Sequence, residues 1–223
     1  MKVDDGGPRQ SATDLAYATV KHRVLYGRYP GGELITEGEV SATVGVSRTP
    51  VREAFLRLQA EGLLRLYPKR GALVVPVSVR DVEDVLEARL LVETFTADKL
   101  LASGVMPSLD ATLAAMISAQ EELLRGADLE AFAGADRAFH QALVTAAGNE
   151  IVTGLYQGLR DRQLRLSLMH VRNSPERLRL AVAEHRAIAR ALRERDPAAA
   201  REAVRVHLSH TGEALRRSPW SVS

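Results

Sequence analysis

The chain of 223 residues contains no cysteine. Disulfide bonds, thiolate metal sites and cysteine nucleophiles are therefore excluded, and any bound metal must be held by histidine, aspartate or glutamate. No apolar run approaches the roughly 20 residues that a helix needs to cross a bilayer. The N-terminal stretch MKVDDGGPRQSATD lacks the apolar core of a signal peptide, so we expect a cytoplasmic protein without membrane contact.

A strong net charge is also missing. The formal net charge is +2, and the hydrophobic content of 46% is ample for a packed core. Residues 1–77 carry 11 basic and 8 acidic side chains, whereas residues 78–223 carry 19 and 20. This asymmetry is mild, and by itself it does not identify a protein that binds nucleic acid.

The chain divides into two regions near Pro76-Val77-Ser78, because short helical patterns and a strand-like tail give way there to helix after helix. We predict a mainly α protein, with an N-terminal winged helix-turn-helix and a C-terminal antiparallel bundle of about six helices. The predicted parts are a flexible N-terminus (1–11), a DNA-binding domain (12–77), a helical domain for effector, metal and dimerisation (78–217), and a C-terminal tail (218–223).

Helix signals are clear in the first region. An amphipathic pattern over residues 12–27 predicts a helix. The stretch TEGEV is a capping box, in which Thr36 and Glu39 begin a short helix that runs through Val44. Gly45 is expected to end that helix with a sharp turn.

A third helix and a hairpin follow. Ser47 is the expected cap of the helix, and Pro50 is tolerated in its first turn. Its apolar stripe consists of Val51, Ala54, Phe55 and Leu58. After Gly62, the stretches LLRLY and ALVVPV have strand composition, and PKRG between them predicts the tip of a hairpin. This order of elements is typical of a winged helix-turn-helix.

The third helix would read DNA. Arg48 and Arg52 are four residues apart on the face opposite the apolar stripe, near the N-terminus of the helix. From there they can reach the major groove, where a guanidinium matches O6 and N7 of guanine. Ser47 and Thr49, with the free backbone N–H groups of the first turn, suit phosphate oxygens.

The hairpin tip would form the wing. Lys69 and Arg70 are expected to contact the DNA backbone or the minor groove, and Gly71 permits the tight turn. A single arginine or lysine is more often a solvated surface residue. The basic residues of this chain, however, cluster at the two places that a winged helix presents to DNA.

The second region predicts six helical segments and no strand. Their starts are marked by Ser78, Pro107, Asp128, Asn149, Ser174-Pro175 and Asp196-Pro197, and the last segment runs to about Arg217.

Polar residues fall inside the apolar stripes of several of these helices. Asp136 and His140 lie four residues apart in the third segment, His185 lies in the fifth, and His207 lies in the sixth. Burying an unpaired carboxylate costs several kcal/mol, so something must compensate the charge. A divalent cation would compensate all four residues together. Three imidazoles with one carboxylate suit zinc best, with nickel, iron or manganese as alternatives.

The N-terminal region resembles a known family. The stretches VSRTPVREAFLRLQAEGLL and RGALVVPVS are similar to the signature of GntR-type bacterial transcription regulators, over about residues 12–77. This resemblance implies a winged helix-turn-helix that binds operator DNA. Members commonly carry an arginine between the two acids of the preceding helix, where this chain has Gly38. The departure leaves Arg48 and Arg52 with more of the base readout.

The C-terminal region resembles the helical effector-binding (FCD-type) domain of the FadR/VanR branch of that family. The stretches that carry the resemblance are ADRAFHQALVTAAGNEIV, EHRAIARALRERDPAAAREAVRVHL and EARLLVETFTADKLLA. In many members an aspartate and three histidines at these positions hold a divalent metal. Here those residues are Asp136, His140, His185 and His207.

The same resemblance suggests an effector site. Arg89 and Glu93 lie inside the apolar stripe of the first segment. Arg89 corresponds to an arginine of the family that faces an acidic effector. The carboxylate of that effector completes the coordination shell of the metal. Asn149 lies in the "GN" turn of the family, where capping and effector contact are both open. Six helices, rather than the seven of the FadR type, are more similar to the VanR type.

These features together predict a dimeric repressor that binds a palindromic operator, with half-sites about 34 Å apart. A small organic acid bound at the metal and Arg89 would change operator affinity through linkage. Two alternatives stay open. A metal-dependent enzyme could activate water at the same four residues, although the sequence shows no further general acid or base in register. A regulator could also bind its effector without metal.

Overall fold

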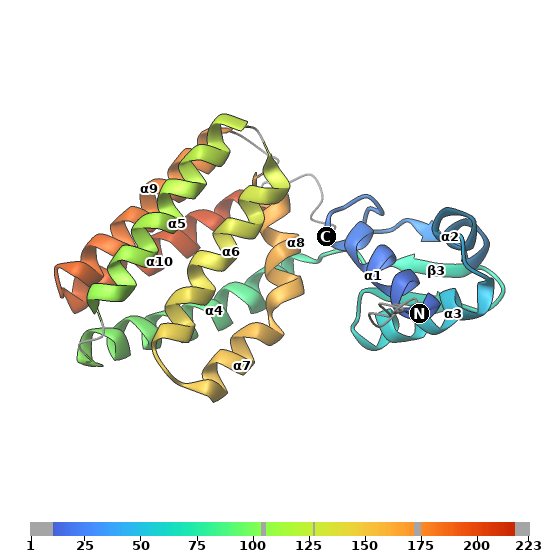
Figure 1. Cartoon of the computed structure of the whole chain (residues 1–223), viewed down its shortest axis with the longest axis horizontal. Coiled ribbons are helices and arrows are strands. Elements are labelled where there is room, and N and C mark those ends of the chain that lie inside the picture. The colour runs from blue at the N-terminus through green and yellow to red at the C-terminus, as the bar shows by residue number, and fades with distance from the viewer. Residues whose placement is uncertain (1–10, 104–105, 127, 172–174, 217–223) are drawn as a thin grey trace, which may run out of the picture. The chain divides into compact units, whose positions relative to one another are not determined.

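The computed structural model describes residues 11–103, 106–126, 128–171 and 175–216. The chain splits into two compact units, Met1–Pro76 and Val77–Ser223 (Figure 1). The predicted flexible N-terminus lies outside the described residues except for Ser11, which caps the first helix by accepting a hydrogen bond from the Asp14 N–H. The predicted tail at 218–223 lies outside them as well. No helix in the described ranges is long and apolar enough to span a membrane.

The first unit contains three helices and three short strands within its described part. The helices are α1 (Ala12–Leu25), α2 (Glu37–Val44) and α3 (Arg48–Ala60), and the strands are β1 (Leu34–Ile35), β2 (Leu64–Tyr67) and β3 (Gly71–Val74). The strands form an antiparallel sheet in the order β1-β3-β2. The hairpin of β2 and β3 confirms the predicted wing, whereas β1 was not predicted.

Local signals position helices α2 and α3 as expected. Thr36 and Glu39 form a complete capping box at the start of α2, and Gly45 ends that helix in the left-handed conformation with φ of 76°. The predicted apolar stripe of α3 is wholly buried. Ser47 stands at the N-cap position of α3, but its side chain makes no capping hydrogen bond, so that part of the prediction is wrong.

The second unit is entirely helical in its described residues and confirms the predicted fold class. The part of this unit that the structure describes forms seven helices, α4 (Val79–Ser103), α5 (Met106–Gly126), α6 (Leu129–Ala146), α7 (Glu150–Gly158), α8 (Arg160–Val171), α9 (Pro175–Arg193) and α10 (Pro197–Arg216). The predicted count of six is therefore wrong by one, and the argument for the VanR type that rested on it falls. The Ser174 part of one predicted start lies outside the described residues.

The extra helix arises because the segment after Asn149 breaks into α7 and α8. The Leu159 N–H bonds to the Tyr156 carbonyl at 3.1 Å, three residues back, and the Gln163 N–H bonds to the Leu159 carbonyl at 2.8 Å to continue as α8. Two glycines, Gly154 and Gly158, weaken the helix before this point, since each costs about 1 kcal/mol relative to alanine. Residues 158–160 contain neither a proline nor a side chain typical of a helix cap, so the sequence does not indicate that a helix ends there.

The helices of the second unit enclose one interior. Helix α4 packs along α10, α10 packs along α9, and α5 packs against both α6 and α9. Helix α6 also contacts α4, α7 and α8. Residues on α4, α6, α9 and α10 therefore face a shared core, although long stretches of sequence separate them.

Candidate metal centre and DNA-binding surface

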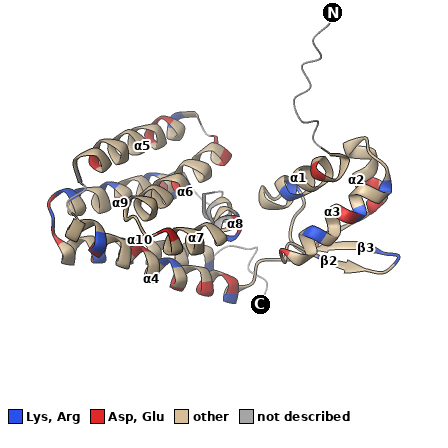
Figure 2. Ribbon diagram, turned by 60° about the horizontal axis from the view of Figure 1, so that its bottom comes forward, with Lys and Arg blue, Asp and Glu red and all other residues tan. Residues whose placement is uncertain are grey.

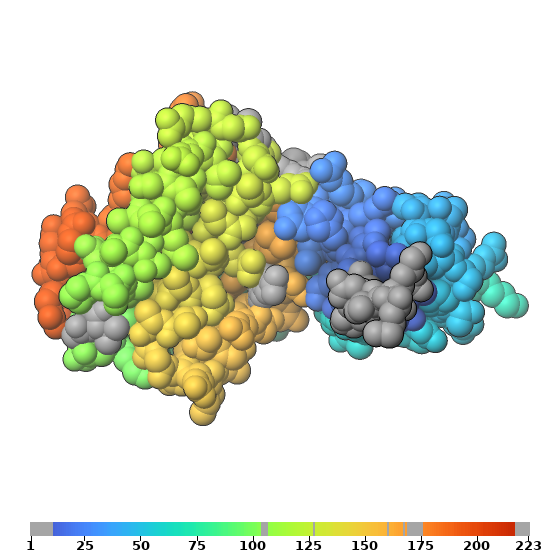
Figure 3. Space-filling model, viewed as in Figure 1, coloured from blue at the N-terminus to red at the C-terminus, as the bar shows by residue number. Residues whose placement is uncertain are grey.

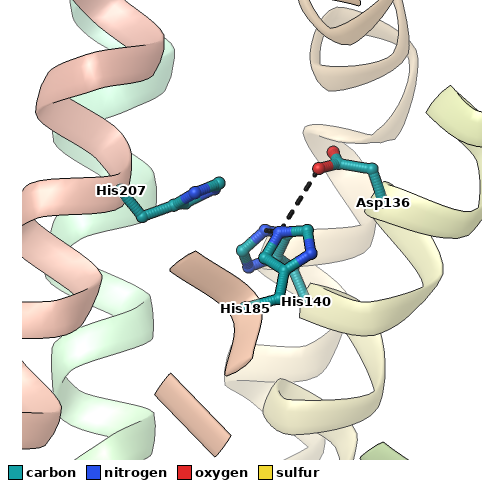
Figure 4. A group of neighbouring side chains, drawn as sticks. All are labelled: Asp136, His140, His185 and His207. Carbon is teal, nitrogen blue, oxygen red and sulfur yellow. Dashed lines mark hydrogen bonds and ion pairs between the residues drawn. The ribbon is translucent and has the colours of Figure 1, made fainter. Parts of the chain in front are cut away.

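Four side chains from three helices converge inside the second unit (Figure 4). Asp136 and His140 come from α6, His185 comes from α9, and His207 comes from α10. All four are buried, and one possible ligand atom from each lies within 4.8 Å of those of the others. The structure thus brings together the four residues that the sequence singled out as metal ligands.

The closest atoms in this cluster are ring nitrogens. His185 Nε2 lies 3.2 Å from His140 Nε2 and 3.4 Å from Asp136 Oδ1. In a tetrahedral zinc site with Zn–N bonds of 2.0–2.1 Å, neighbouring nitrogens are about 3.3 Å apart. The spacing of the two Nε2 atoms therefore fits two ligands of one small cation.

The opposite ring nitrogen of each histidine faces a hydrogen-bond acceptor. His185 Nδ1 lies 2.7 Å from Gln120 Oε1, and His207 Nδ1 lies 2.8 Å from Glu184 Oε2. His140 Nδ1 lies 3.0 Å from Glu93 Oε2, close enough for an ion pair, although the angle does not meet that of a hydrogen bond. These acceptors favour a proton on each Nδ1, which leaves each Nε2 with a lone pair.

This arrangement is unfavourable without a cation. The lone pairs of His140 and His185 stand 3.2 Å apart and close to the Asp136 carboxylate, with no proton of their own to share. Neutral imidazole nitrogens and one carboxylate are ligands that divalent transition metals prefer. The donor set and its orientation therefore fit a divalent metal.

The electrostatics agree with this protonation. Burial lowers the pKa of His185 and His207 well below 6.5, so both imidazoles are neutral at pH 7. Burial works to raise the pKa of Asp136, but electrostatic interactions with the neighbouring histidines and with Arg89 lower it to about 2. The cluster thus offers the neutral imidazoles of His185 and His207 and an ionised carboxylate.

Glu93 joins the cluster to Arg89 and to α7. Its Oε1 accepts hydrogen bonds from Arg89 Nε at 2.7 Å and from the Tyr156 hydroxyl at 2.6 Å, while its Oε2 faces His140. Burial opposes ionisation of Glu93, but the Arg89 guanidinium lowers its pKa well below the usual value. Arg89 Nη2 is buried and has no hydrogen-bond partner in the described part of the chain. A donor is therefore left over for an anion beside the cluster.

Two of the three acceptors behind the imidazoles, Gln120 and Glu184, were missed from the sequence. Gln120 continues the buried stripe of α5, three residues after Ile117, and could have been found as a polar residue in an apolar stripe. Glu184 directly precedes His185, and its second oxygen binds His210 Nδ1 at 2.6 Å. His210 on α10 thus shares this carboxylate with His207.

Two further acids lie near the cluster. Glu93 and Glu184 are both buried beside it. Each faces an Nδ1 atom, however, on the side of the imidazole away from Nε2. Asn149, the other predicted effector residue, is the N-cap of α7, and its Oδ1 accepts a hydrogen bond from the Val152 N–H at 3.2 Å. Of the two roles left open for Asn149, the structure shows capping.

The first unit carries the predicted DNA-binding residues on one side of α3 and at the hairpin tip. Figure 2 shows basic residues along α3 and at the turn between β2 and β3. A groove of about 760 Å³ runs between the two elements, and its lining includes Arg48, Arg52, Lys69, Arg70 and Gly71. Ser47 and Thr49 are exposed at the start of α3, outside that lining.

Two glycines shape this groove. Gly71 has a φ of 106°, and a Cβ atom there would lie 2.3 Å from the Ile35 carbonyl oxygen, so only glycine lets β1 and the wing pack together. A Cβ atom on Gly38 would lie 3.5 Å from Arg48 Nη2. The Arg48 guanidinium thus lies next to the position where the resembling family commonly has an arginine.

Two protein-family models match the chain, one over each unit. The model of "Bacterial regulatory proteins, gntR family" matches residues 12–74, and the model of the FCD domain matches residues 84–210. The gntR family and the relatives described below are transcriptional regulators and not enzymes, so the enzyme alternative is dismissed.

Individual proteins are similar over nearly the whole chain. An HTH-type transcriptional regulator in an unstable DNA locus of Streptomyces ambofaciens is 36% identical over 90% of this chain and 84% of its own. The HTH-type transcriptional repressor RspR of Escherichia coli is 30% identical over 94% and 91%. The solved structure of E. coli McbR/YncC has the same fold, with a TM-score of 0.73 and 21% identity over 93% of this chain and 98% of its own. The chain belongs to the GntR family of bacterial transcriptional regulators and carries an FCD domain.

Proposed function

We propose that this regulator is a dimeric repressor that releases a palindromic operator when a small organic acid binds at a divalent metal in its helical unit. The observation that carries the metal part is the convergence of three buried imidazoles and the Asp136 carboxylate. Repression, rather than activation, is supported by RspR, which is 30% identical and is named a repressor. We expect the protein to act in the cytoplasm, where operator DNA lies.

The metal would be held by Asp136, His140, His185 and His207, with zinc as the expected ion. A divalent cation with an open coordination position would bind a carboxylate oxygen of the effector. Arg89 would hold a second carboxylate oxygen of the same acid. Its Nη2 is a buried charged donor that has no hydrogen-bond partner in the described residues. Glu93 holds Arg89 through its Nε and would keep the guanidinium plane fixed.

On the DNA side, Arg48 and Arg52 would read base edges in the major groove, and Lys69 and Arg70 would contact the backbone from the wing. Ser47 and Thr49 would contact phosphates at the exposed start of α3. The Ser47 hydroxyl is not used to cap its own helix, which supports this role.

The test is a titration of the full chain with a palindromic DNA fragment from the region upstream of its own gene, followed by fluorescence anisotropy. Protein with zinc should bind the fragment more tightly than a scrambled one, and one member of a set of sugar acids, hydroxy acids and aromatic acids should weaken binding. A His185→Ala, His207→Ala double variant should still bind DNA but ignore that acid. If the metal-free protein responds to the acid as the zinc form does, the effector binds without metal. If no fragment is preferred under any condition, the proposal is wrong.

A further inference from the structure

Gln163 on α8 is a buried glutamine with an unused hydrogen-bond donor. Its side chain is 4% exposed, and its Nε2 has no hydrogen-bond partner in the described part of the chain. A buried amide donor without an acceptor is unfavourable, and the large majority of buried side-chain polar atoms in folded proteins are paired. Gln163 therefore presents a donor for which the described residues supply no acceptor.

Two contacts fix the part of α4 that Gln163 faces. Leu166, one turn after Gln163, belongs to the same apolar cluster as Val85 near the start of α4. Tyr156 on α7, which precedes Gln163 in sequence, donates its hydroxyl proton to Glu93, about two turns further along α4. The chain from α7 to α8 thus runs antiparallel to α4. Because Gln163 lies between these two contacts, it faces the stretch of α4 between Val85 and Glu93.

Arg89 lies in this stretch of α4 and also has an unused donor. Its Nη2 is buried and without a partner in the described residues, whereas its Nε donates to Glu93. The guanidinium helps to lower the pKa of Asp136, which shows that it lies near the candidate metal ligands. Helix α8 itself packs against α6, which carries Asp136 and His140. One charged and one neutral donor therefore face the interior beside the candidate metal centre.

This part of the interior is shielded from bulk water. Arg89 and Gln163 are each 5% exposed or less. In the space-filling view, the atoms of α5, α6 and α7 cover the face of the helical unit that is turned to the viewer (Figure 3). Any acceptor that pairs with the two donors must therefore be enclosed with them in the core.

The charges around the centre restrict the chemistry of this acceptor. A divalent ion and Arg89 would supply three positive charges against the carboxylates of Asp136 and Glu93, which leaves room for one further carboxylate. Glu184, behind the imidazoles, can only reduce this surplus. A second carboxylate would be buried without compensation, which is strongly unfavourable. The neutral amide of Gln163 instead suits a neutral oxygen.

We propose that Gln163 selects the effector, and that the effector is a monocarboxylate with a hydroxyl or carbonyl oxygen that accepts a hydrogen bond from Gln163 Nε2. This inference rests on the proposed function, in which the metal and Arg89 hold the carboxylate. Gln163 then discriminates between acids that share the carboxylate, because an acid without the second oxygen leaves the buried donor unpaired.

The test compares acids of equal carbon number on the zinc-loaded full chain by isothermal titration calorimetry. The three-carbon set is L-lactate, propionate and tartronate, and the four-carbon set is L-threonate, butyrate and L-tartrate. Each set contains a hydroxy monocarboxylate, its counterpart without a hydroxyl, and a hydroxy dicarboxylate. In at least one set, the hydroxy monocarboxylate should bind about 10-fold more tightly than either of the other two acids, which corresponds to about 1.4 kcal/mol.

Gln163→Leu keeps the approximate volume of the side chain and removes the donor. The preference of this variant for the hydroxy acid over its counterpart without a hydroxyl should fall about 10-fold, while its zinc Kd stays that of the wild type. The metal-free variant should unfold at the same or a higher urea concentration than the metal-free wild type, because the unpaired donor is gone. Gln157→Leu, at an exposed glutamine of α7, is the matched control and should keep the preference.

Three results would overturn this inference. Gln163→Leu could keep the full preference, or the wild type could bind the dicarboxylate most tightly of its set. Either result removes the role of Gln163 or the charge limit but leaves a metal-dependent effector site in place. If the zinc-loaded wild type binds none of the six acids, the inference is also wrong, and the wider set of acids in the operator titration then decides the proposed function separately.

Discussion

Gln120 offers the sharpest test of the idea that hydrogen bonds behind the imidazoles prepare the metal ligands. Its side chain is completely buried, and its Oε1 lies 2.7 Å from His185 Nδ1. Replacing it with leucine keeps the approximate volume but removes the acceptor that holds the proton on Nδ1. The proton can then move to Nε2, which points toward the other ligands and must be free to bind a cation.

Loss of such a partner typically lowers metal affinity 10–100-fold, which is about 1.4–2.7 kcal/mol. We therefore expect the zinc Kd of Gln120→Leu to rise by that factor in a competition titration with a chromophoric chelator. The free energy of unfolding should also fall by about 1–3 kcal/mol, because the buried His185 Nδ1 loses its acceptor and the hydrogen bond from Gln120 Nε2 to the Ala135 carbonyl at 3.1 Å is lost as well. The ¹⁵N chemical shifts of His185 would report the change of tautomer directly.

Gln163→Leu is the matched control. Gln163 is also a buried glutamine, on α8, but its Nε2 has no hydrogen-bond partner in the described part of the chain. Its substitution should leave the zinc Kd and the His185 tautomer unchanged. The reasoning is refuted if Gln120→Leu binds zinc as tightly as the wild type, or if both variants lose affinity equally.

Three further predictions concern pH, DNA and a glycine. Because burial lowers the pKa of His185 and His207 well below 6.5, the unfolded chain binds more protons than the folded chain as pH falls below 6.5. The free energy of unfolding of the metal-free protein should therefore fall by up to about 1.4 kcal/mol per pH unit for each histidine, in urea titrations across this range, and a flat profile would contradict it. Arg48→Ala should weaken operator binding by about 1–3 kcal/mol and relax the sequence preference. Lys69→Ala should weaken binding to all DNA sequences and reduce the slope of log K against log salt concentration by about 1. If Arg48→Ala loses the same affinity for specific and for scrambled DNA, Arg48 does not read bases. Gly71→Ala should lower the stability of the first unit by about 2 kcal/mol or more in thermal melts, because the new Cβ would lie 2.3 Å from the Ile35 carbonyl oxygen. Gly45→Ala is the control and should cost less, because Gly45 also has a positive φ but no atom lies within 4 Å of its Cβ position.

The parts of the molecule that the sequence predicts are those fixed by local patterns. The capping box of Thr36 and Glu39 and the left-handed Gly45 depend on residues within one turn, so their signals are complete in the sequence. The four candidate ligands were found because a charged or ionisable group inside an apolar stripe needs compensation wherever the stripe packs. Neither inference required knowledge of which helices are neighbours.

The parts that were missed depend on contacts across the chain. Strand β1 is two residues long and exists through its pairing with β3, so its own composition carries little signal. Gln120 meets His185 across 65 residues of sequence, and Tyr156 meets Glu93 across 63. A buried glutamine or tyrosine is common in helical cores, and only the packing of α5 against α9 and of α7 against α4 gives these two their roles.

The most direct test of the metal centre is the metal content of the full chain by elemental analysis, after loading with zinc and exhaustive dialysis against metal-free buffer. We predict one divalent ion per chain, and none in a His140→Ala, His185→Ala double variant treated in the same way. A wild-type chain that retains no ion, or a double variant that retains as much as the wild type, would contradict the account.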